Sequence, residues 1–211
     1  MTRRFIIQSL AGLIFIILIG LWADSKIAEQ IQFSVKESLT NSLNISEQAI
    51  ISLFQGNHNT VAALALSKEV MLLTKELLAI ETSREKLINS SAQRKLRSII
   101  SPLLKAHYFR GFFVISPNNI SLASTRDVNT GVINPLIEQP ALLEKIWRGQ
   151  TGVSLPQISD VPLENEKGES VVNYATMYSA APIKDENHNI IAILTLRINP
   201  FDQFTRVLQR G

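Results

Sequence analysis

The residues from Phe109 to Thr125, FRGFFVISPNNISLAST, constrain the fold of this chain more than any other stretch. A run of apolar residues reaches Ser-Pro-Asn-Asn at positions 116–119, and a second short run from Ile120 alternates apolar and small polar residues. Proline fixes φ and asparagine tolerates a positive φ, as a tight turn requires. Two strand-like runs around such a turn predict a β-hairpin. Helical patterns precede this hairpin and strand patterns follow it, so it divides the chain into a helical half and a sheet half.

The N-terminal residues predict where in the cell the protein is located. Residues 5–22, FIIQSLAGLIFIILIGLW, carry no charge, and as a helix they would extend about 27 Å, enough to cross the hydrocarbon core of a bilayer. Arg3 and Arg4 precede them, while acidic and basic residues follow, so the positive-inside bias keeps residues 1–4 in the cytoplasm. We therefore expect a single-pass protein of the cell inner membrane, with the remainder periplasmic or extracellular. A cleaved signal peptide is the alternative. Residues 21–23, at the end of the apolar segment, are however a poor cleavage site, because they do not follow the small-x-small pattern.

The helical half follows that segment. From residue 23 to about residue 78 there is no proline, and Gly56 is the only glycine. Apolar residues recur at every fourth position from Ile27 to Leu43, which is typical of a helix. The polar residues 55–59 predict a kink or a local break. A second amphipathic helix is predicted from residue 82 or 83 to Leu104.

These two helices are expected to pack as a hairpin over one face of the sheet. The pattern leaves open a second interpretation, in which the first helix also forms a parallel homodimer with another copy. Because the apolar positions drift away from a strict seven-residue repeat, a long coiled coil is not expected. Any such dimer would be confined to the part of the helix nearest the membrane.

Beyond the hairpin, a polar loop at residues 126–131 leads to a helix that Asn134-Pro135 opens and that Gly149 is placed to end. A third strand is predicted over residues 152–159, and Pro156 places it at an edge.

A solvent-exposed loop is expected at residues 160–168. Residues 171–183 alternate as in a strand, and residues 190–198, IIAILTLRI, are nearly continuously apolar, as in a central strand buried on both faces. A last helix is predicted to begin at Phe201.

Three sequential strands joined by short turns predict antiparallel pairing. The fold class is therefore α+β, with a five-stranded antiparallel sheet. The predicted regions are a cytoplasmic N-terminus at 1–4, a transmembrane helix at 5–22, a helical region at 23–104, a sensor lobe at 105–200 and the start of a link to a further segment at 201–211.

Composition excludes several classes of function. The formal charge of +3 is small and the basic residues are scattered, so no nucleic-acid surface is expected. There is no cysteine, which excludes disulfides and thiolate chemistry. The three histidines are far apart in the chain, and no nucleophile elbow or phosphate-binding glycine loop is present. We expect no metal, no cofactor and no catalytic residue.

Taken together, FFVISPNNISLAST at the hairpin, RDVNTG after it, and the NYATMYSAAPI and IIAILTLRINP strands resemble the extracytoplasmic Cache sensor domains of bacterial transmembrane receptors. The chain is most similar to the membrane-distal half of a double Cache domain. The resemblance implies a PAS-like sheet with long N-terminal helices on one face and a small-molecule pocket on the other. It also implies signalling across the membrane to an output domain, often in a dimer, with any catalytic activity beyond residue 211.

The sequence departs from the amino-acid-binding version of that family. There, an arginine is followed two positions later by tryptophan and tyrosine, whereas Arg126 is followed by Asp127, Val128 and Asn129. Amino-acid recognition is therefore not predicted. The family also has a second lobe, a second membrane segment and an output domain, none of which these 211 residues contain, so we expect an N-terminal fragment.

Arg126 is the strongest candidate for a ligand contact, because a guanidinium binds a carboxylate through two parallel hydrogen bonds. Its alternative role is a salt bridge to Asp127 or a bond to a loop carbonyl. The other candidates share a strand face or lie beside Arg126, and can equally be packing, capping or turn residues. The full set of predicted ligand-binding residues is Arg126, Ser124, Tyr174, Thr176, Tyr178 and Asn129.

The sequence is consistent with two functions. The first is an extracytoplasmic domain that senses a small, anionic molecule for a transmembrane receptor. The second is a membrane-anchored structural or assembly protein that uses the same domain for protein contacts. A polar-lined open cavity around Arg126 and Tyr178 would favour the sensor, whereas a filled core with an exposed apolar patch would favour the assembly protein.

Overall fold

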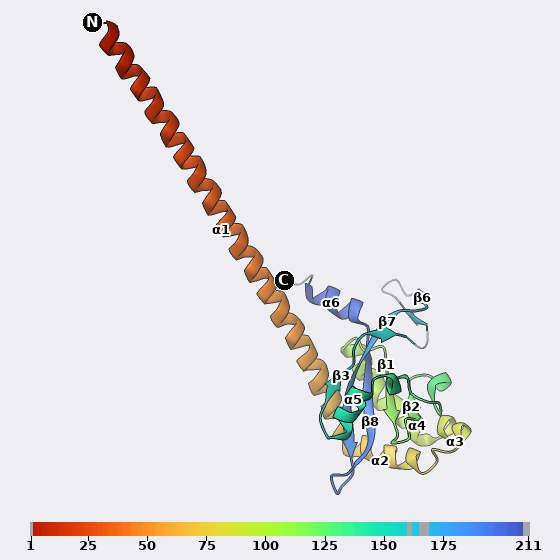
Figure 1. Ribbon diagram of the computed structural model, residues 1–211. Helices are drawn as coiled ribbons and strands as arrows, with labels where there is room; N and C mark the ends of the chain where they lie inside the picture. The colour runs from red at the N-terminus through yellow and green to blue at the C-terminus, as the bar shows by residue number, and fades with distance from the viewer. Residues whose placement is uncertain (1, 160–161, 165–168, 209–211) are drawn as a thin grey trace. The chain divides into compact units, whose positions relative to one another are not determined.

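The computed structural model describes residues 2–159, 162–164 and 169–208. Side chains are not described for most of residues 2–28, nor for residues 163–164 and 206–208. The chain divides into two compact units, of which the first ends at Gln48 and the second begins at Ala49. The sheet and all helices after the first belong to the second unit (Figure 1).

Helix α1 (Thr2–Ala65) enters the second unit with its last turns. In the described part of the chain, no helix has an apolar stretch long enough to cross a membrane. Most side chains of the predicted anchor, residues 5–22, lie outside the described residues, so the anchor stays a prediction.

The break predicted at residues 55–59 does not occur there. Helix α1 continues to Ala65, and helix α2 (Lys68–Leu78) begins after a turn. Polar side chains hold the helix together across the predicted break: Gln55 Nε2 donates to Asn59 Oδ1 at 3.2 Å, and Thr60 Oγ1 donates to the carbonyl of Gly56 at 2.9 Å. Both bonds link residues four positions apart, a spacing that a continuous helix provides.

The second predicted helix is divided into α3 (Arg84–Asn89) and α4 (Ser91–Ala106). Ser90 causes the division, because its backbone is extended with ψ 149° and its side chain accepts a hydrogen bond from the Gln93 amide at 3.0 Å. Ser83 caps α3 in the same way. Serine at these positions satisfies amide donors that the first turn of a helix leaves free.

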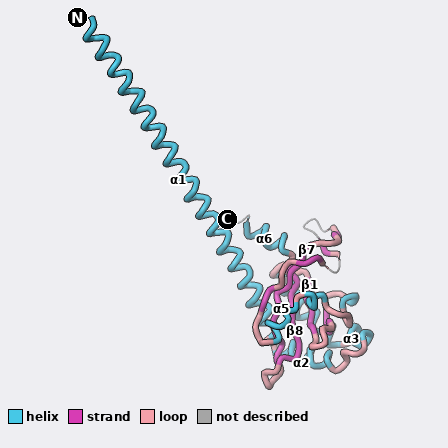
Figure 2. Tube along the Cα trace, in the orientation of Figure 1, coloured by secondary structure: helices cyan, strands magenta, loops and turns pink. Residues whose placement is uncertain are grey.

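The predicted hairpin is confirmed as β1 (Gly111–Ile115) and β2 (Ser121–Ser124), with Asn119 in its turn at φ 60°. The central strand is confirmed as β8 (Ile190–Ile198), which pairs with β1 and with β7 (Ala175–Lys184). In the described residues the strand order is β2-β1-β8-β7-β3, and every pairing is antiparallel. This is the predicted PAS-like, antiparallel α+β fold (Figure 2). In the described residues the sheet has six strands and not the predicted five, because the third predicted strand is divided into two short strands that both pair with β7.

The third predicted strand is shorter than expected. It consists of β3 (Gly152–Val153) and β4 (Gln157–Ile158), and both pair with β7. Strand β7 begins at Ala175 and not near residue 171, because Asn173 adopts φ 56° and interrupts the extended backbone. Ahead of it, β5 (Leu163–Glu164) and β6 (Ser170–Val171) form a separate two-stranded sheet where an open loop was predicted. Residues 160–161 and 165–168 of that loop lie outside the described residues.

The segment after β2 forms two short 3₁₀ helices, η1 (Asp127–Asn129) and η2 (Pro135–Glu138), and then α5 (Pro140–Trp147). The single helix predicted from residue 134 is therefore two elements, which meet at Gln139. Gly149 follows α5 at φ 89°, as predicted for a residue that ends a helix. The final helix, α6 (Pro200–Leu208), is also confirmed.

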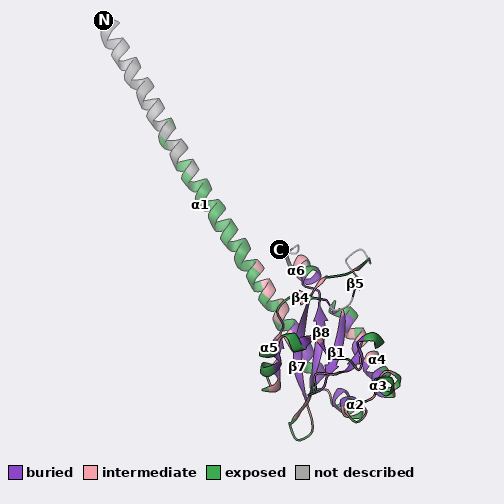
Figure 3. Ribbon diagram, turned by 45° about the vertical axis from the view of Figure 1, so that its right-hand side comes forward, coloured by how far each residue is buried: buried purple, intermediate pink, exposed green. Residues whose placement is uncertain are grey.

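Two hydrophobic clusters sandwich the sheet (Figure 3). Helices α2 to α4 cover one face, where Phe112 and Val114 of β1 are buried. Helix α5 covers the other, where Phe113 and Ile115 are buried. Successive strand residues point to opposite faces, so both faces of β1 are apolar because both are covered.

Candidate ligand site

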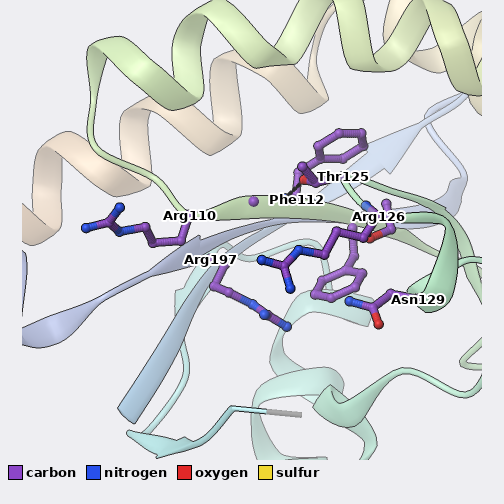
Figure 4. A pocket seen from close by; sticks show the side chains of 9 residues that line it. Arg110, Phe112, Thr125, Arg126, Asn129 and Arg197 are labelled. Carbon is purple, nitrogen blue, oxygen red and sulfur yellow. Dashed lines mark hydrogen bonds between the residues drawn. The ribbon is translucent and has the colours of Figure 1, made fainter. Parts of the chain in front are cut away.

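A small pocket lies at the end of the sheet where β1 begins and β8 ends. The pocket is partly open to solvent and has a volume of about 10 Å³, which is room for about one water molecule. Polar and charged side chains from separate strands and loops meet around it (Figure 4). The pocket is lined by Arg110, Gly111, Phe112, Phe113, Ser124, Thr125, Arg126, Asn129 and Arg197.

Arg197 is the buried charge of this pocket, with only 3% of its surface exposed. Its Nη2 donates to the Tyr178 hydroxyl at 3.0 Å. Its guanidinium carbon also lies 5.2 Å from the ring centre of Phe113 and 5.4 Å from that of Tyr178. Desolvated cation–π contacts of this kind contribute about 2 kcal/mol. The two rings therefore fix the orientation of the guanidinium.

Arg126 is the second arginine of the pocket, and its side chain is exposed. Its Nη1 donates to the carbonyl oxygen of Pro162 at 3.0 Å, while the neighbouring Asp127 pairs with Arg97 at 2.6 Å. Of its two alternative roles, the structure thus shows the bond to a loop carbonyl and not the bond to Asp127. Arg126 and Arg197 extend toward one another, whereas Arg110 points away from both (Figure 4).

The loop that carries Arg126 is fixed by the helices on the opposite face of the sheet. Gln93 Nε2 and Arg97 Nε both donate to the carbonyl of Ser124, at 3.1 and 2.8 Å. Arg84 Nε donates to the carbonyl of Thr130 at 3.0 Å. Backbone carbonyls of the loop are thereby satisfied, which keeps its pocket-facing side chains in place.

The structure brings some of the predicted site residues together and separates others. Ser124, Arg126 and Asn129 line the pocket, and the Ser124 hydroxyl accepts from the Arg126 amide at 3.3 Å. Tyr178 reaches the pocket through Arg197. Thr176, on β7, is fully buried and donates to the carbonyl of Ile198 at 3.3 Å.

Tyr174 does not lie on the strand face where we predicted it. The residue precedes β7, and its ring packs against Phe201 of α6 with 5.7 Å between ring centres. The reason is the left-handed backbone of Asn173, which breaks the alternation on which the prediction depended.

Sequence reasoning missed Arg110 and Arg197. A usable signal existed for Arg197, which is the only charge in the apolar strand IIAILTLRI. A charge at an inward-facing position of a buried strand needs partners, so it indicates a polar site. Among the described residues, no group of three or more histidine, aspartate or glutamate side chains is placed to hold a metal ion.

The fold is that of the Cache-type, PAS-like sensor domains, as the resemblance in the sequence implied. The sensor domain of the histidine kinase DctB from V. cholerae superposes with a TM-score of 0.58 at 13% identity, over 82% of this chain and 58% of that domain. The sensor domain of DcuS from E. coli gives 0.50 at 17% identity, over 75% of this chain and 98% of that domain.

The ligand-binding domain of the Campylobacter jejuni chemoreceptor Tlp3, in complex with L-valine, also gives 0.50, at 11% identity over 84% of this chain and 64% of that domain. The chain thus spans somewhat over half the length of the DctB domain. No protein-family model matches the sequence, and no curated protein matches it significantly. At these identities the comparisons establish the fold.

Proposed function

We propose that this chain is an extracytoplasmic small-molecule sensing domain of a transmembrane signal-transduction receptor, and that its ligand is a small anion with a carboxylate group. One observation carries the proposal. Arg126, which follows β2, and Arg197, on β8, converge on one polar pocket in a fold that sensor domains share. Two guanidinium groups that face one pocket favour an anionic ligand, because both can donate hydrogen bonds to it.

Hydrogen-bonding geometry favours a carboxylate. A guanidinium presents parallel N–H donors that match the two oxygens of a carboxylate. The bond from Arg126 to the neutral carbonyl of Pro162 is weaker than a bond to a charged oxygen. A carboxylate ligand would therefore replace Pro162 as the partner of Arg126.

The size of the pocket implies a conformational change on binding. A space of about 10 Å³ cannot admit a metabolite. Release of Arg126 from Pro162 would separate the loop after β2 from the segment before β5 and enlarge the pocket. The ligand would select the open population, which makes the domain a two-state sensor.

A thermal-shift screen of the full chain in detergent tests the proposal. The probes are small mono- and dicarboxylates, each paired with its uncharged amide. A ligand at 100 times its Kd stabilises the folded state by about 2.7 kcal/mol, which raises the Tm of a domain of this size by roughly 5–10 °C.

Arg126→Ala should reduce the shift by half or more, because loss of a charged hydrogen bond costs about 1.5–3 kcal/mol of binding free energy. The matched control is Arg148→Ala, which removes an exposed arginine directly after α5 that, among the described ion pairs, pairs with Glu144 of that helix. A carboxylate whose shift is unchanged in Arg126→Ala, or an amide that shifts the Tm equally, would refute the assignment of the site.

The membrane context belongs to the proposal as well. Residues 5–22 would anchor the chain in the inner membrane, with residues 1–4 in the cytoplasm and the sheet outside. Trypsin added to spheroplasts should then digest the sheet unit, whereas a cytoplasmic control protein survives. Protection of the sheet unit would contradict this topology.

In the receptor, two copies of the chain would form a homodimer in which the two α1 helices contact one another. The apolar positions predicted to face a second copy are all more than half exposed in the first unit, at Ile27, Ile31, Val35, Leu39 and Leu43. A row of apolar side chains at a spacing of four residues favours a short crossing of two helices over a long coiled coil. Ile31→Lys should abolish a dimer detected by chemical cross-linking in membranes.

The assembly protein remains as a second candidate because of one surface feature. An apolar groove of about 430 Å³ runs beside α5, lined in part by Pro140, Leu142, Val153 and Leu155. Leu155 is 75% exposed there. If Leu155→Glu disrupts a complex in cells while Arg126→Ala does not affect signalling, the second candidate is favoured.

A further inference from the structure

The last helix of the domain is attached to the first by a buried polar contact. Asn57 of α1 donates from Nδ2 to Gln203 Oε1 of α6 at 2.9 Å, across 146 positions of sequence. Both side chains are at least 95% buried. Beside them, the rings of Phe54 and Phe204 meet edge to face with 5.8 Å between centres. All four residues belong to the second unit.

The same helix is attached to the sheet by an ion pair. Asp202, which is 1% exposed, accepts a hydrogen bond from Arg110, the residue that precedes β1. Asn199 starts the helix, since its Oδ1 accepts from the amides of Phe201 and Asp202 at 3.0 and 3.4 Å. Arg110 also lines the candidate pocket, and Arg197 of that pocket lies only three residues before Pro200.

These contacts leave several buried polar atoms unsatisfied. Within the described residues, Asp202 Oδ1, Asn199 Nδ2 and Arg110 Nε have no hydrogen-bond partner. A buried polar atom without a partner lowers the stability of the arrangement that buries it. A polar interface with three such atoms is therefore weaker than the apolar core on either face of the sheet.

Side chains from three parts of the fold hold the start of α6. Gln203 contacts Asn57 of α1, Asp202 contacts Arg110 before β1, and the ring of Phe201 packs against Tyr174 before β7. Because two of these three attachments are polar, loss of the contacts with α1 and Arg110 should release the helix from the domain.

We propose that α6 is a releasable latch, which the Asn57–Gln203 contact holds against α1 and the Arg110–Asp202 ion pair holds against the start of β1, and which opens while the sheet stays folded. The latch joins the helix that leads into the domain to the helix that leads out of it. Its state can therefore be transmitted in either direction along the chain. The inference is drawn from these contacts alone and does not depend on the proposed ligand.

Amide hydrogen exchange of the full chain in detergent, without any ligand, tests the latch. In the wild type, the amides of α6 should exchange at least tenfold faster than those of β8. Asp202→Asn should accelerate exchange in α6 a further tenfold or more and leave β7 and β8 unchanged. Gln203→Ala, which removes the partner of Asn57 and retains the ion pair, should act in the same direction.

The matched control is Glu186→Gln, which also converts an ion-paired carboxylate to an amide, here in the pair with Lys75. It should leave α6 unchanged. Equal protection of α6 and β8 in the wild type would overturn the proposal, because α6 would then open only with global unfolding. So would variants that leave α6 unchanged, or that accelerate β8 as much as α6.

Discussion

Gly131 offers the sharpest test of how the loop after β2, which carries Arg126, is attached. The residue follows the pocket-lining Asn129 and has φ 72°. A Cβ at this position would lie 2.6 Å from Arg84 Cγ, 2.8 Å from Arg84 Cβ and 2.9 Å from Arg84 Cα. The last of these atoms is backbone and cannot rotate away. Gly131→Ala therefore combines backbone strain with a steric clash against α3.

The two contributions can be estimated separately. A left-handed backbone costs a residue with a Cβ about 1–2 kcal/mol, and overpacking costs about 1–3 kcal/mol more. We expect Gly131→Ala to destabilise the domain by roughly 2–5 kcal/mol. Gly149→Ala is the matched control, because Gly149 has φ 89° but the nearest atom to its Cβ would be Lys184 Nζ at 3.7 Å. Gly149→Ala should therefore destabilise the domain only by the cost of the left-handed backbone.

Urea denaturation measures both variants. In a Trp22→Phe background, Trp147 becomes the only tryptophan, and it packs against the cluster beneath α5. The difference between the two midpoints, at constant slope, isolates the contact with Arg84. If Gly131→Ala costs no more than Gly149→Ala, then the loop is not packed against α3 as described, and the fixed position of Arg126 loses its basis.

Three further outcomes are expected. Tyr178→Phe should destabilise the domain by about 1–3 kcal/mol, because it removes a buried hydroxyl to which Arg197 donates, and urea unfolding will measure the loss. Gly56→Ala should stabilise it by about 0.5–1 kcal/mol in the same assay, since Gly56 is inside α1 with nothing within 4 Å of its Cβ position. Burial alone would raise the pKa of Asp185, but hydrogen bonds from Asn189 and Asn187 outweigh it and hold the pKa below its ordinary value. The turn between β7 and β8 should therefore keep this contribution at neutral pH and lose it as the pH falls through the lowered pKa, which the amide proton shifts of Asn189 will report by NMR.

Local sequence signals predicted the regular parts of the fold well. The hairpin around residues 116–119 and the apolar strand that became β8 both follow from turn chemistry and from burial on two faces. Errors arose where a single residue overrode a periodic pattern. Ser90 divided a helix that its flanking residues favoured, and Asn173 shortened a strand that alternated convincingly.

The candidate site was predictable only in part, for a geometric reason. Ser124, Arg126 and Asn129 are neighbours in sequence, so one motif could indicate all three. Arg197 comes from a strand that pairs with β1, and only the register of Gly111 opposite Arg197 brings it to the same place. A sequence pattern does not contain that register.

The pocket and the latch are connected through the strand that both share. Arg197 is at the pocket end of β8, and Asn199, two residues later, holds the first turn of α6. Strand β8 is paired on both sides, by β1 and by β7, and a closely packed interior transmits strain. A ligand that draws Arg197 toward Arg126 would therefore move the start of α6. Buried polar atoms around Asp202 have no hydrogen-bond partner among the described residues. We therefore expect a displacement to cost less free energy at α6 than in the apolar core.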